Sequence, residues 1–413
     1  MKLFRINIIS FRNWIMHLFL CLLIIFDLRT YLVTGSGISI ITSGLIFFYL
    51  VCYLYLCVLY PKIYIRFFDV IVFLFLCIYG ARVYVNIYID GIYNTIFENN
   101  ITYIVYFFLL AALPYQACRR IPFSKIHIET LLVILFVFYF LALIYSFSNV
   151  MTSIAMKTYV GNEGRFEANA MLDTIGYGHL GLTLVLISFS LLICHHKKLI
   201  IGILGGLGIL CGALSIILAN SRSPMLALLV CLIIIFSNRI SFRLLLLISI
   251  LVSLFVIYID EINIFFQEVF KSQFIDRFLT IFKGDGNGMS GRNIYYNQGW
   301  AIFSDNPLLG QSFLLTSGDI KGDYVHNSFL ESLMAGGLLG GILYIIMTLW
   351  GVTCSYKLIN NRSRYIFFAL FFIQMLTYSL FSRSFIALPL YWVSFDYVFR
   401  SVEQPKTIRN IQT

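Results

Sequence analysis

Three arginines in this sequence are candidates for binding an anion, although Arg292 and Arg165, each taken alone, could equally be ordinary loop arginines. Arg222 lies in ANSRSPMLAL at the end of an apolar run, and an arginine placed in lipid costs roughly 2.5 to 3.5 kcal/mol. It could snorkel to the interface, form a buried ion pair or bind an anionic ligand. Arg292 follows GMSG and opens a predicted helix, whose first backbone N–H groups could hold a phosphate together with the guanidinium. Arg165, in EGRFEANAMLD, could do the same or could pair with Glu163 or Glu167.

His326 supplies a group suited to proton transfer near neutral pH. It precedes Asn327 at the start of a predicted membrane helix, and an imidazole has an unperturbed pKa of about 6.5. A histidine at a membrane boundary is more often structural than catalytic. Here, however, Glu331 follows little more than one helical turn later and could orient the ring. The same helix contains two glycine pairs that allow close packing of helices or of a lipid chain: Gly336–Gly337 and Gly340–Gly341.

Together these residues gather basic groups near one surface. The sequence contains no Walker-type loop, no metal-ligand cluster, no thiol nucleophile pattern and no paired carboxylates. Arginines can bind a diphosphate, and a histidine can remove a proton from a hydroxyl group. A glycosyl transfer from a lipid diphosphate needs those two actions, because the leaving diphosphate already carries its negative charge. The pattern therefore implies neither a metal nor a cofactor.

The elements that must position these residues are membrane helices. Of 413 residues, 60% are hydrophobic and 12% are charged, which leaves too little polar surface for a soluble globular protein. Apolar runs long enough to cross a hydrocarbon core recur along the chain. The predicted fold class is an all-α polytopic membrane protein of about twelve transmembrane helices with a large periplasmic loop. The predicted spans are 14–28, 38–60, 67–85, 100–117, 128–147, 179–194, 199–219, 225–237, 244–259, 327–351, 366–380 and 385–399.

Basic clusters between the apolar runs predict which ends of the helices face the cytoplasm. With the amino terminus inside, every predicted inner segment contains Lys or Arg and both termini are cytoplasmic. Topology thus explains most of the net charge of +10, and no nucleic-acid partner is implied. Other basic residues lie outside or near the outer surface and need another reason. They are Arg29, Arg82, Lys157, Arg165, Arg222, Lys271, Arg277, Lys283, Arg292, Lys321 and Arg383.

Two long polar segments are predicted on the outer, periplasmic side, at 148–178 and 260–326. The second contains an amphipathic stretch, a GDGNGMSG joint, a helix from Arg292 to Ser304 and the turn DNPLLG. The chain is therefore divided into four parts. They are 1–147 with five spans, 148–259 with the first outer loop and spans six to nine, 260–326 as the catalytic loop, and 327–413 with the last three spans and a cytoplasmic tail.

The stretch GR…GWAIFSDNPLLGQSF…YVHNSFLESLMAGGLLGGILY resembles the O-antigen ligase and polymerase superfamily of bacterial envelope glycosyltransferases. His326 and Asn327 are followed by Gly337 and Gly340 with the spacing of the family's histidine motif. The resemblance extends over roughly residues 160–350, a range that includes the three candidate arginines.

Each candidate arginine has a counterpart in the family's pattern. Arg222 in the SRSP turn and Arg292 ahead of the NPLLG turn occupy the places of essential outer-face arginines. The separation of Arg165 from Gly181 is similar to a looser arginine-to-glycine pattern of polymerase outer loops. The resemblance implies that these arginines clamp a diphosphate while His326 deprotonates the acceptor.

The resemblance also implies the substrates and the place of the reaction. The donor would be undecaprenyl diphosphate carrying a saccharide, and the transfer would be inverting, metal-independent and located at the periplasmic face of the bacterial inner membrane. Asn327 and Glu331 would lie on the substrate side of the site, membrane lipid would be a partner, and a polysaccharide chain-length regulator is a candidate partner.

The acceptor distinguishes two activities that share these motifs. A polymerase moves the growing chain onto another lipid-linked repeat unit, whereas a ligase moves the finished chain onto lipid A core. The compact connection of 34 positions from Arg292 to His326, with YVHNSFLE at its end, favours a polymerase. A flippase or transporter of lipid-linked sugars is the competing class, although transporters usually place charges near the bilayer midplane and contain inverted repeats.

Overall fold

All regular secondary structure that the computed structural model describes is helical, as the sequence predicted. No strand occurs among the described residues. The description covers residues 17–18, 20, 37–61, 65–92, 101–121, 126–155, 174–195, 199–219, 221–237, 250, 253–254, 257–270, 275 and 292–403.

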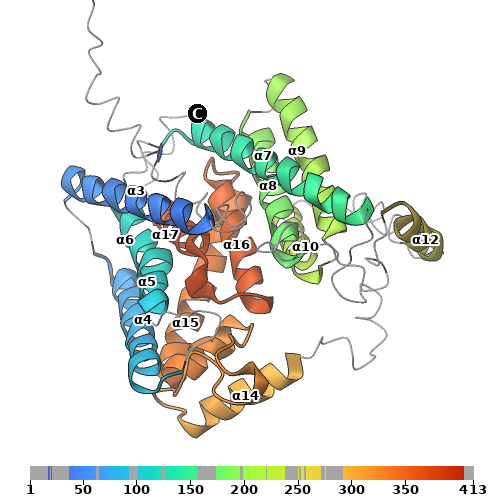
Figure 1. Ribbon diagram of the computed structural model, residues 1–413. Coiled ribbons are helices and arrows are strands. Elements are labelled where there is room, and N and C mark those ends of the chain that lie inside the picture. Colours follow the sequence, from blue (N-terminus) through green and yellow to red (C-terminus); the bar gives the residue numbers. More distant parts are fainter. Residues whose placement is uncertain are drawn as a thin grey trace, which may run out of the picture.

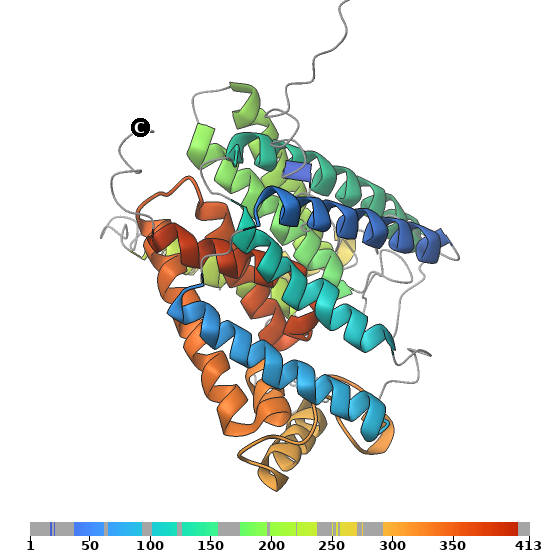
Figure 2. The same ribbon diagram turned by 90° about the vertical axis from the view of Figure 1, so that its left-hand side faces the viewer.

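The helices are arranged as a bundle whose members run in different directions (Figures 1 and 2). A π-helical segment extends α4 to Ile89, and another joins α5 to α6. The helices are α3 (Gly37–Leu59), α4 (Phe67–Tyr84), α5 (Ile101–Phe107), α6 (Leu113–Arg120), α7 (Ile128–Ala155), α8 (Thr174–His195), α9 (Leu199–Leu218), α10 (Arg222–Phe236), α12 (Ile259–Phe270), α14 (Arg292–Asp305), α15 (Ser328–Asn360), α16 (Ile366–Phe381) and α17 (Pro389–Glu403).

Helix α16 forms the centre of the bundle. Every residue from Ile366 to Ser379 is buried, which is the pattern expected of a helix that is apolar on all sides. It packs against α8, α10, α15 and α17, and Figure 1 shows it between the α4 side and the α7–α9 side of the molecule. Because neighbours surround it, the chain that leaves its carboxyl end has a fixed position.

Helices α7, α8 and α9 form a group beside α16. Gly181 of α8 and Gly212 of α9 bring the two backbones together: a Cβ at Gly181 would lie 2.6 Å from the Gly212 carbonyl oxygen, and one at Gly212 would lie 2.5 Å from the Gly181 oxygen. Any side chain at either position would push the helices apart. This contact fixes the amino-terminal half of α8, which carries His179.

A cluster of paired charges lies at the end of the bundle away from His326. The Arg119 guanidinium contacts the Asp69 carboxylate and lies 3.5 Å from that of Asp396, and Arg400 lies 2.7 Å from Asp396. All four side chains are largely buried. This paired-charge cluster ties together α4, α6 and α17, which are far apart in the sequence.

Five described helices are long and apolar enough to cross a membrane. Three shorter apolar helices accompany them, at 46–59, 222–236 and 366–381. The predicted spans 14–28 and 244–259 lie largely outside the described residues, so twelve spans remains a prediction. The five long helices are Phe67–Ile89, Ile128–Phe147, Thr174–Ile193, Leu199–Leu218 and Ser328–Asn360.

Several helix boundaries depart from the prediction. Helix α7 continues to Ala155 and α8 begins at Thr174, so both helices extend into the predicted outer loop 148–178. Helix α10 begins at Arg222 rather than at 225, since Pro224 is tolerated in a first helical turn, where its missing N–H has no intrahelical partner. Helix α15 continues to Asn360, nine residues beyond the predicted end at 351. The predicted helix from Arg292 to Ser304 is confirmed as α14, which ends at Asp305.

Candidate functional site

Helix α15 is broken near its start, at Gly337. This residue has φ 59° and ψ −154°, which interrupts the helical hydrogen bonds. The turn of the DNPLLG sequence fills the break, because the N–H of Leu338 donates to the carbonyl of Pro307 at 2.7 Å. A Cβ at Gly337 would lie 2.3 Å from the Leu308 carbonyl oxygen. Glycine is therefore required both by the backbone angle and by the approach of the turn.

The end of the turn is held against the same break. Gly310 has φ 70°, and a Cβ there would lie 2.5 Å from the Met334 carbonyl oxygen. That carbonyl, left over by the broken helix, accepts from the N–H groups of Gln311 at 2.8 Å and Ser312 at 3.1 Å. The predicted turn is confirmed, and its partner is the glycine-rich part of α15.

Arg82 of α4 stabilises this assembly from the other side. Its guanidinium donates to the main-chain carbonyls of Leu309 (3.0 Å), Gly310 (2.7 Å), Gln311 (3.2 Å) and Ala335 (3.0 Å). The Arg82 side chain thus binds both the turn and α15, the helix that the turn interrupts. This contact explains why an arginine occurs at the predicted outer end of α4, where the charge rule for inner segments does not apply.

Asn86, in the π-helical segment after α4, makes a second connection to the segment after the turn. Its amide donates to the Gln311 carbonyl at 3.0 Å and its carbonyl accepts from the Phe313 N–H at 3.0 Å. The side chain is fully buried. Neither Arg82 nor Asn86 was predicted as a site residue. The sequence did contain a signal for Arg82, because it is a basic residue at the predicted outer end of a membrane helix.

His326 precedes α15 and is held by the chain that leaves α16. Its Nδ1 lies 2.9 Å from the carbonyl oxygen of Ser382. A carbonyl can only accept, so Nδ1 carries the proton and Nε2 is the basic nitrogen of the neutral ring. His326 has φ 56°, a conformation that is uncommon for residues other than glycine and that directs the chain out of the loop and into α15.

Helix α14 brings Arg292 to the same end of the bundle. Arg292 is its first residue and is half-buried, and Tyr295, one turn later, packs its ring 5.3 Å from the ring of His326. Figures 1 and 2 show α14 lying across the end of α15. The Tyr295 hydroxyl donates to Asp323 at 3.4 Å, and burial together with this carboxylate raises the pKa of Tyr295 above its usual value.

Asn327 and Glu331 have structural contacts in α15. The Asn327 side-chain carbonyl accepts from the N–H groups of Phe329 and Leu330 and so caps the helix. Glu331 is fully buried and accepts from the hydroxyls of Tyr79 and Ser384, each at 2.5 Å. The contact predicted between Glu331 and the imidazole is replaced by the Ser382 carbonyl, because Glu331 faces α4 and the chain after α16.

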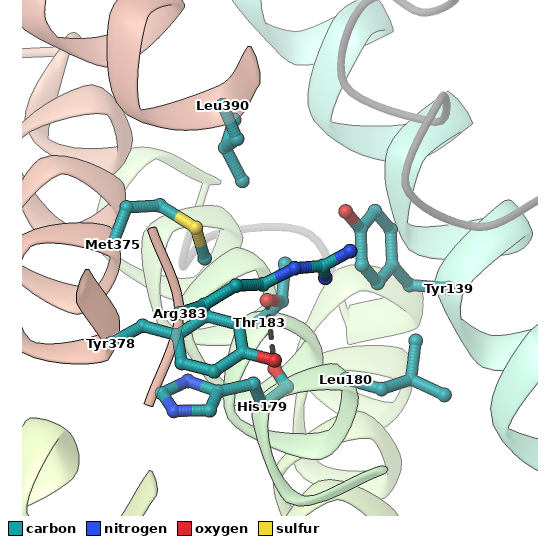
Figure 3. Close-up of a pocket in the computed structure, with 8 residues that line it drawn as sticks. All are labelled: Tyr139, His179, Leu180, Thr183, Met375, Tyr378, Arg383 and Leu390. Carbon is teal, nitrogen blue, oxygen red and sulfur yellow. Dashed lines mark hydrogen bonds between the residues drawn. The ribbon is translucent and has the colours of Figure 1, made fainter. Parts of the chain in front are cut away.

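The segment Ser382–Arg383–Ser384 joins these groups, although no role was predicted for it. Ser382 holds His326, Ser384 holds Glu331, and Arg383 between them lines a cavity that also contains His179 (Figure 3). A signal was present in the sequence, since SRS occurs both at 221–223 and at 382–384, each time next to an apolar run.

Arg222 precedes Ser223, which contacts His179 in the wall of the cavity that Arg383 lines. It is the half-buried first residue of α10, and the Ser223 hydroxyl lies 3.0 Å from Nε2 of His179. Contacts of neighbouring residues thus connect Arg222 to His179, which shares a cavity with Arg383, and connect Arg292 to His326. Arg165 falls in 156–173, outside the described residues, and stays a prediction.

Comparison with protein families finds a match over the middle of the chain. Residues 207–345 match the O-antigen ligase family. The resemblance to the O-antigen ligase and polymerase superfamily is confirmed. The matched part includes Arg222, Arg292 and His326 as well as the turn and the broken helix, and it indicates a ligase- or polymerase-type activity in a glycosyltransferase-like enzyme family. A search of curated proteins found no match to the chain.

Proposed function

We propose that this protein is an O-antigen polymerase of the bacterial inner membrane, working at the periplasmic face. It moves a growing saccharide from undecaprenyl diphosphate onto a sugar of another lipid-linked repeat unit. The observation that carries the proposal is the setting of His326 within the family-matched segment. Its Nδ1 is fixed on a main-chain carbonyl, which leaves Nε2 as the base, and its ring packs on the helix that Arg292 opens.

The reaction needs one base and several cations. Nε2 of His326 takes the proton of the acceptor hydroxyl while that oxygen attacks the anomeric carbon. The bond from this carbon to the diphosphate oxygen breaks, and attack from the opposite side inverts the configuration. The diphosphate leaves with its electron pair and its charge, which Arg222 and Arg292, with Arg165, stabilise. No group has to protonate the leaving diphosphate, so the proposal requires no metal.

The structure supports a rigid rather than an adaptable base. The turn 305–310 fills the break in α15 and is fixed by Arg82, and the Ser382 carbonyl follows the fully packed α16. A general base must lie within hydrogen-bonding distance of the proton it removes, so a fixed ring favours catalysis.

A ligase that transfers the finished chain to lipid A core is the second candidate, supported by the description of the matched family. Lipopolysaccharide from cells that lack the protein distinguishes the two. Core carrying a single repeat unit is expected for a lost polymerase. Core without repeats, together with polymer left on undecaprenyl lipid, would show a ligase instead. Normal polymer would contradict both activities.

A further inference from the structure

A small cavity lies between helices α7, α8 and α16 (Figure 3). Its volume is about 20 Å³, enough for one water-sized group. Arg383 extends across it toward Tyr139 of α7, and Tyr378 and His179 form another wall. The polar groups that line the cavity are thus a guanidinium, an imidazole and hydroxyls, which is a set suited to an oxygen atom of an anion.

His179 contributes a ring nitrogen that is buried and available. The residue is 3% exposed, and its ring stacks on that of Tyr378 with centroids 3.8 Å apart. Nε2 is occupied by the Ser223 hydroxyl at 3.0 Å, whereas Nδ1 has no hydrogen-bond partner among the described residues. A buried polar atom without a partner costs roughly 1 to 3 kcal/mol, so a bound group that satisfies Nδ1 would be favoured.

The surroundings hold this imidazole in place. Gln374 of α16 donates to the His179 carbonyl at 3.0 Å and to the Thr183 hydroxyl at 2.8 Å, and Thr183 donates to the same carbonyl at 2.9 Å. These hydrogen bonds fix α8 against α16 at the level of the cavity. The position of the ring is therefore set before any ligand arrives.

The cavity also lies between the two predicted halves of the reaction site. On one side, Arg383 follows Ser382, whose carbonyl holds His326. On the other side, His179 contacts Ser223, which follows Arg222. A ligand group in the cavity would therefore be next to both the chain that fixes the base and the helix that begins with an arginine.

We propose that Arg383 and His179 form a further binding site for the diphosphate of the lipid-linked donor, with one phosphoryl oxygen in the cavity. This inference rests on the proposed donor. Arg383 contributes charge and paired N–H donors, and His179 donates from Nδ1 when the Ser223 hydroxyl donates to Nε2. The cavity accepts one oxygen of the group, and the rest of the diphosphate lies at its opening.

Binding of sugar-free undecaprenyl diphosphate to the purified full-length protein tests the site without requiring transfer. The variants are Arg383→Gln, Arg383→Lys and His179→Gln. The control is Arg364→Gln, because Arg364 is exposed and precedes the amino-terminal end of α16, whereas Arg383 follows the carboxyl-terminal end. We expect Arg383→Gln to weaken binding about tenfold or more and Arg383→Lys less, because the point charge remains. Arg364→Gln should bind like the wild type.

Two comparison ligands identify the source of the anion. Arg383-dependent binding of inorganic diphosphate supports the anion site, whereas Arg383-dependent binding of phosphatidylglycerol alone would overturn the assignment to the donor. Wild-type affinity for undecaprenyl diphosphate in both folded Arg383 variants would also overturn it, and thermal unfolding reports whether each variant is folded. Since His326→Ala should bind the lipid and fail only in transfer, an error in the proposed base and an error in this site give different results.

Discussion

At one end of the bundle Arg119 and Arg400 contact the carboxylates of Asp69 and Asp396, whereas at the other end Arg82 donates to four main-chain carbonyls. Carboxylates cancel the charge of an arginine, but carbonyl dipoles solvate it and leave it in place. The paired-charge cluster is thus suited to holding helices together. At the end around His326, Arg82 instead fixes the turn 305–310 against α15 through main-chain carbonyls, with the Asp90 carboxylate nearby.

The largest effect is expected when the paired-charge cluster loses a carboxylate. Asp396→Asn leaves Arg400 and Arg119 without their shared carboxylate in a buried setting, and we expect a loss of about 4 kcal/mol in the free energy of unfolding. Transfer per folded molecule should stay at the wild-type value. Denaturation and transfer assays on Asp396→Asn measure both, with Asp319→Asn, an exposed carboxylate, as the control. A specific loss of transfer would show that the cluster belongs to the reaction site.

Gly337→Ala should have the next largest effect, at the other end. The new Cβ would meet Leu308 in a backbone conformation that alanine avoids, and we expect about 3 kcal/mol of destabilisation. Transfer should also fall, because the turn would move away from α15. Gly206→Ala is the matched control, since a Cβ there meets nothing within 4 Å and alanine favours a helix. Equal behaviour of the two variants would contradict the account of the break.

Arg82→Lys keeps the positive charge of the side chain and removes the forked guanidinium. An ammonium cannot reach all four carbonyls, so we expect about 2 kcal/mol of destabilisation and a larger fractional loss of transfer. Arg364→Lys serves as the control. Transfer at the wild-type rate in Arg82→Lys would mean that charge alone, and not the hydrogen bonds to the turn, matters at this position.

The smallest effect concerns Tyr295 at high pH. Its pKa is raised in the folded protein, so the unfolded chain loses this proton first and stability falls as the pH rises above about 10. Tyr295→Phe should reduce that fall while changing little at pH 7. Unfolding curves at pH 8 and pH 11 measure the difference, and an identical fall in both proteins would exclude Tyr295 as its source.

Local sequence predicted the parts of the site whose signals are local. Glycine and proline residues marked the start of α14 and the DNPLLG turn, and His326 stood out by its chemistry. The break at Gly337 could not be predicted, because it depends on a turn about thirty residues earlier. Arg82 contacts carbonyls more than two hundred positions away, and such contacts leave no periodic pattern.

Arg383 could not be recognised as a site residue from its local sequence. It was counted among outer basic residues, where a lone arginine at the end of an apolar run is indistinguishable from one that snorkels to the interface. Only packing of α16 against α8 shows that it shares a cavity with a buried histidine. It also lies beyond residues 207–345, so the family match does not point to it.

We propose His326 as the base of a transfer from a lipid diphosphate. The most direct test is polymer formation by the purified protein with undecaprenyl-diphosphate-linked repeat units, comparing the wild type with His326→Ala and His326→Asn. Asparagine tolerates the positive φ at this position but cannot act as a base. The Asn variant therefore distinguishes the loss of the base from an effect of backbone strain. We expect both variants to lose transfer at least about a hundredfold while still binding undecaprenyl diphosphate. Transfer at the wild-type rate in either variant would contradict the account.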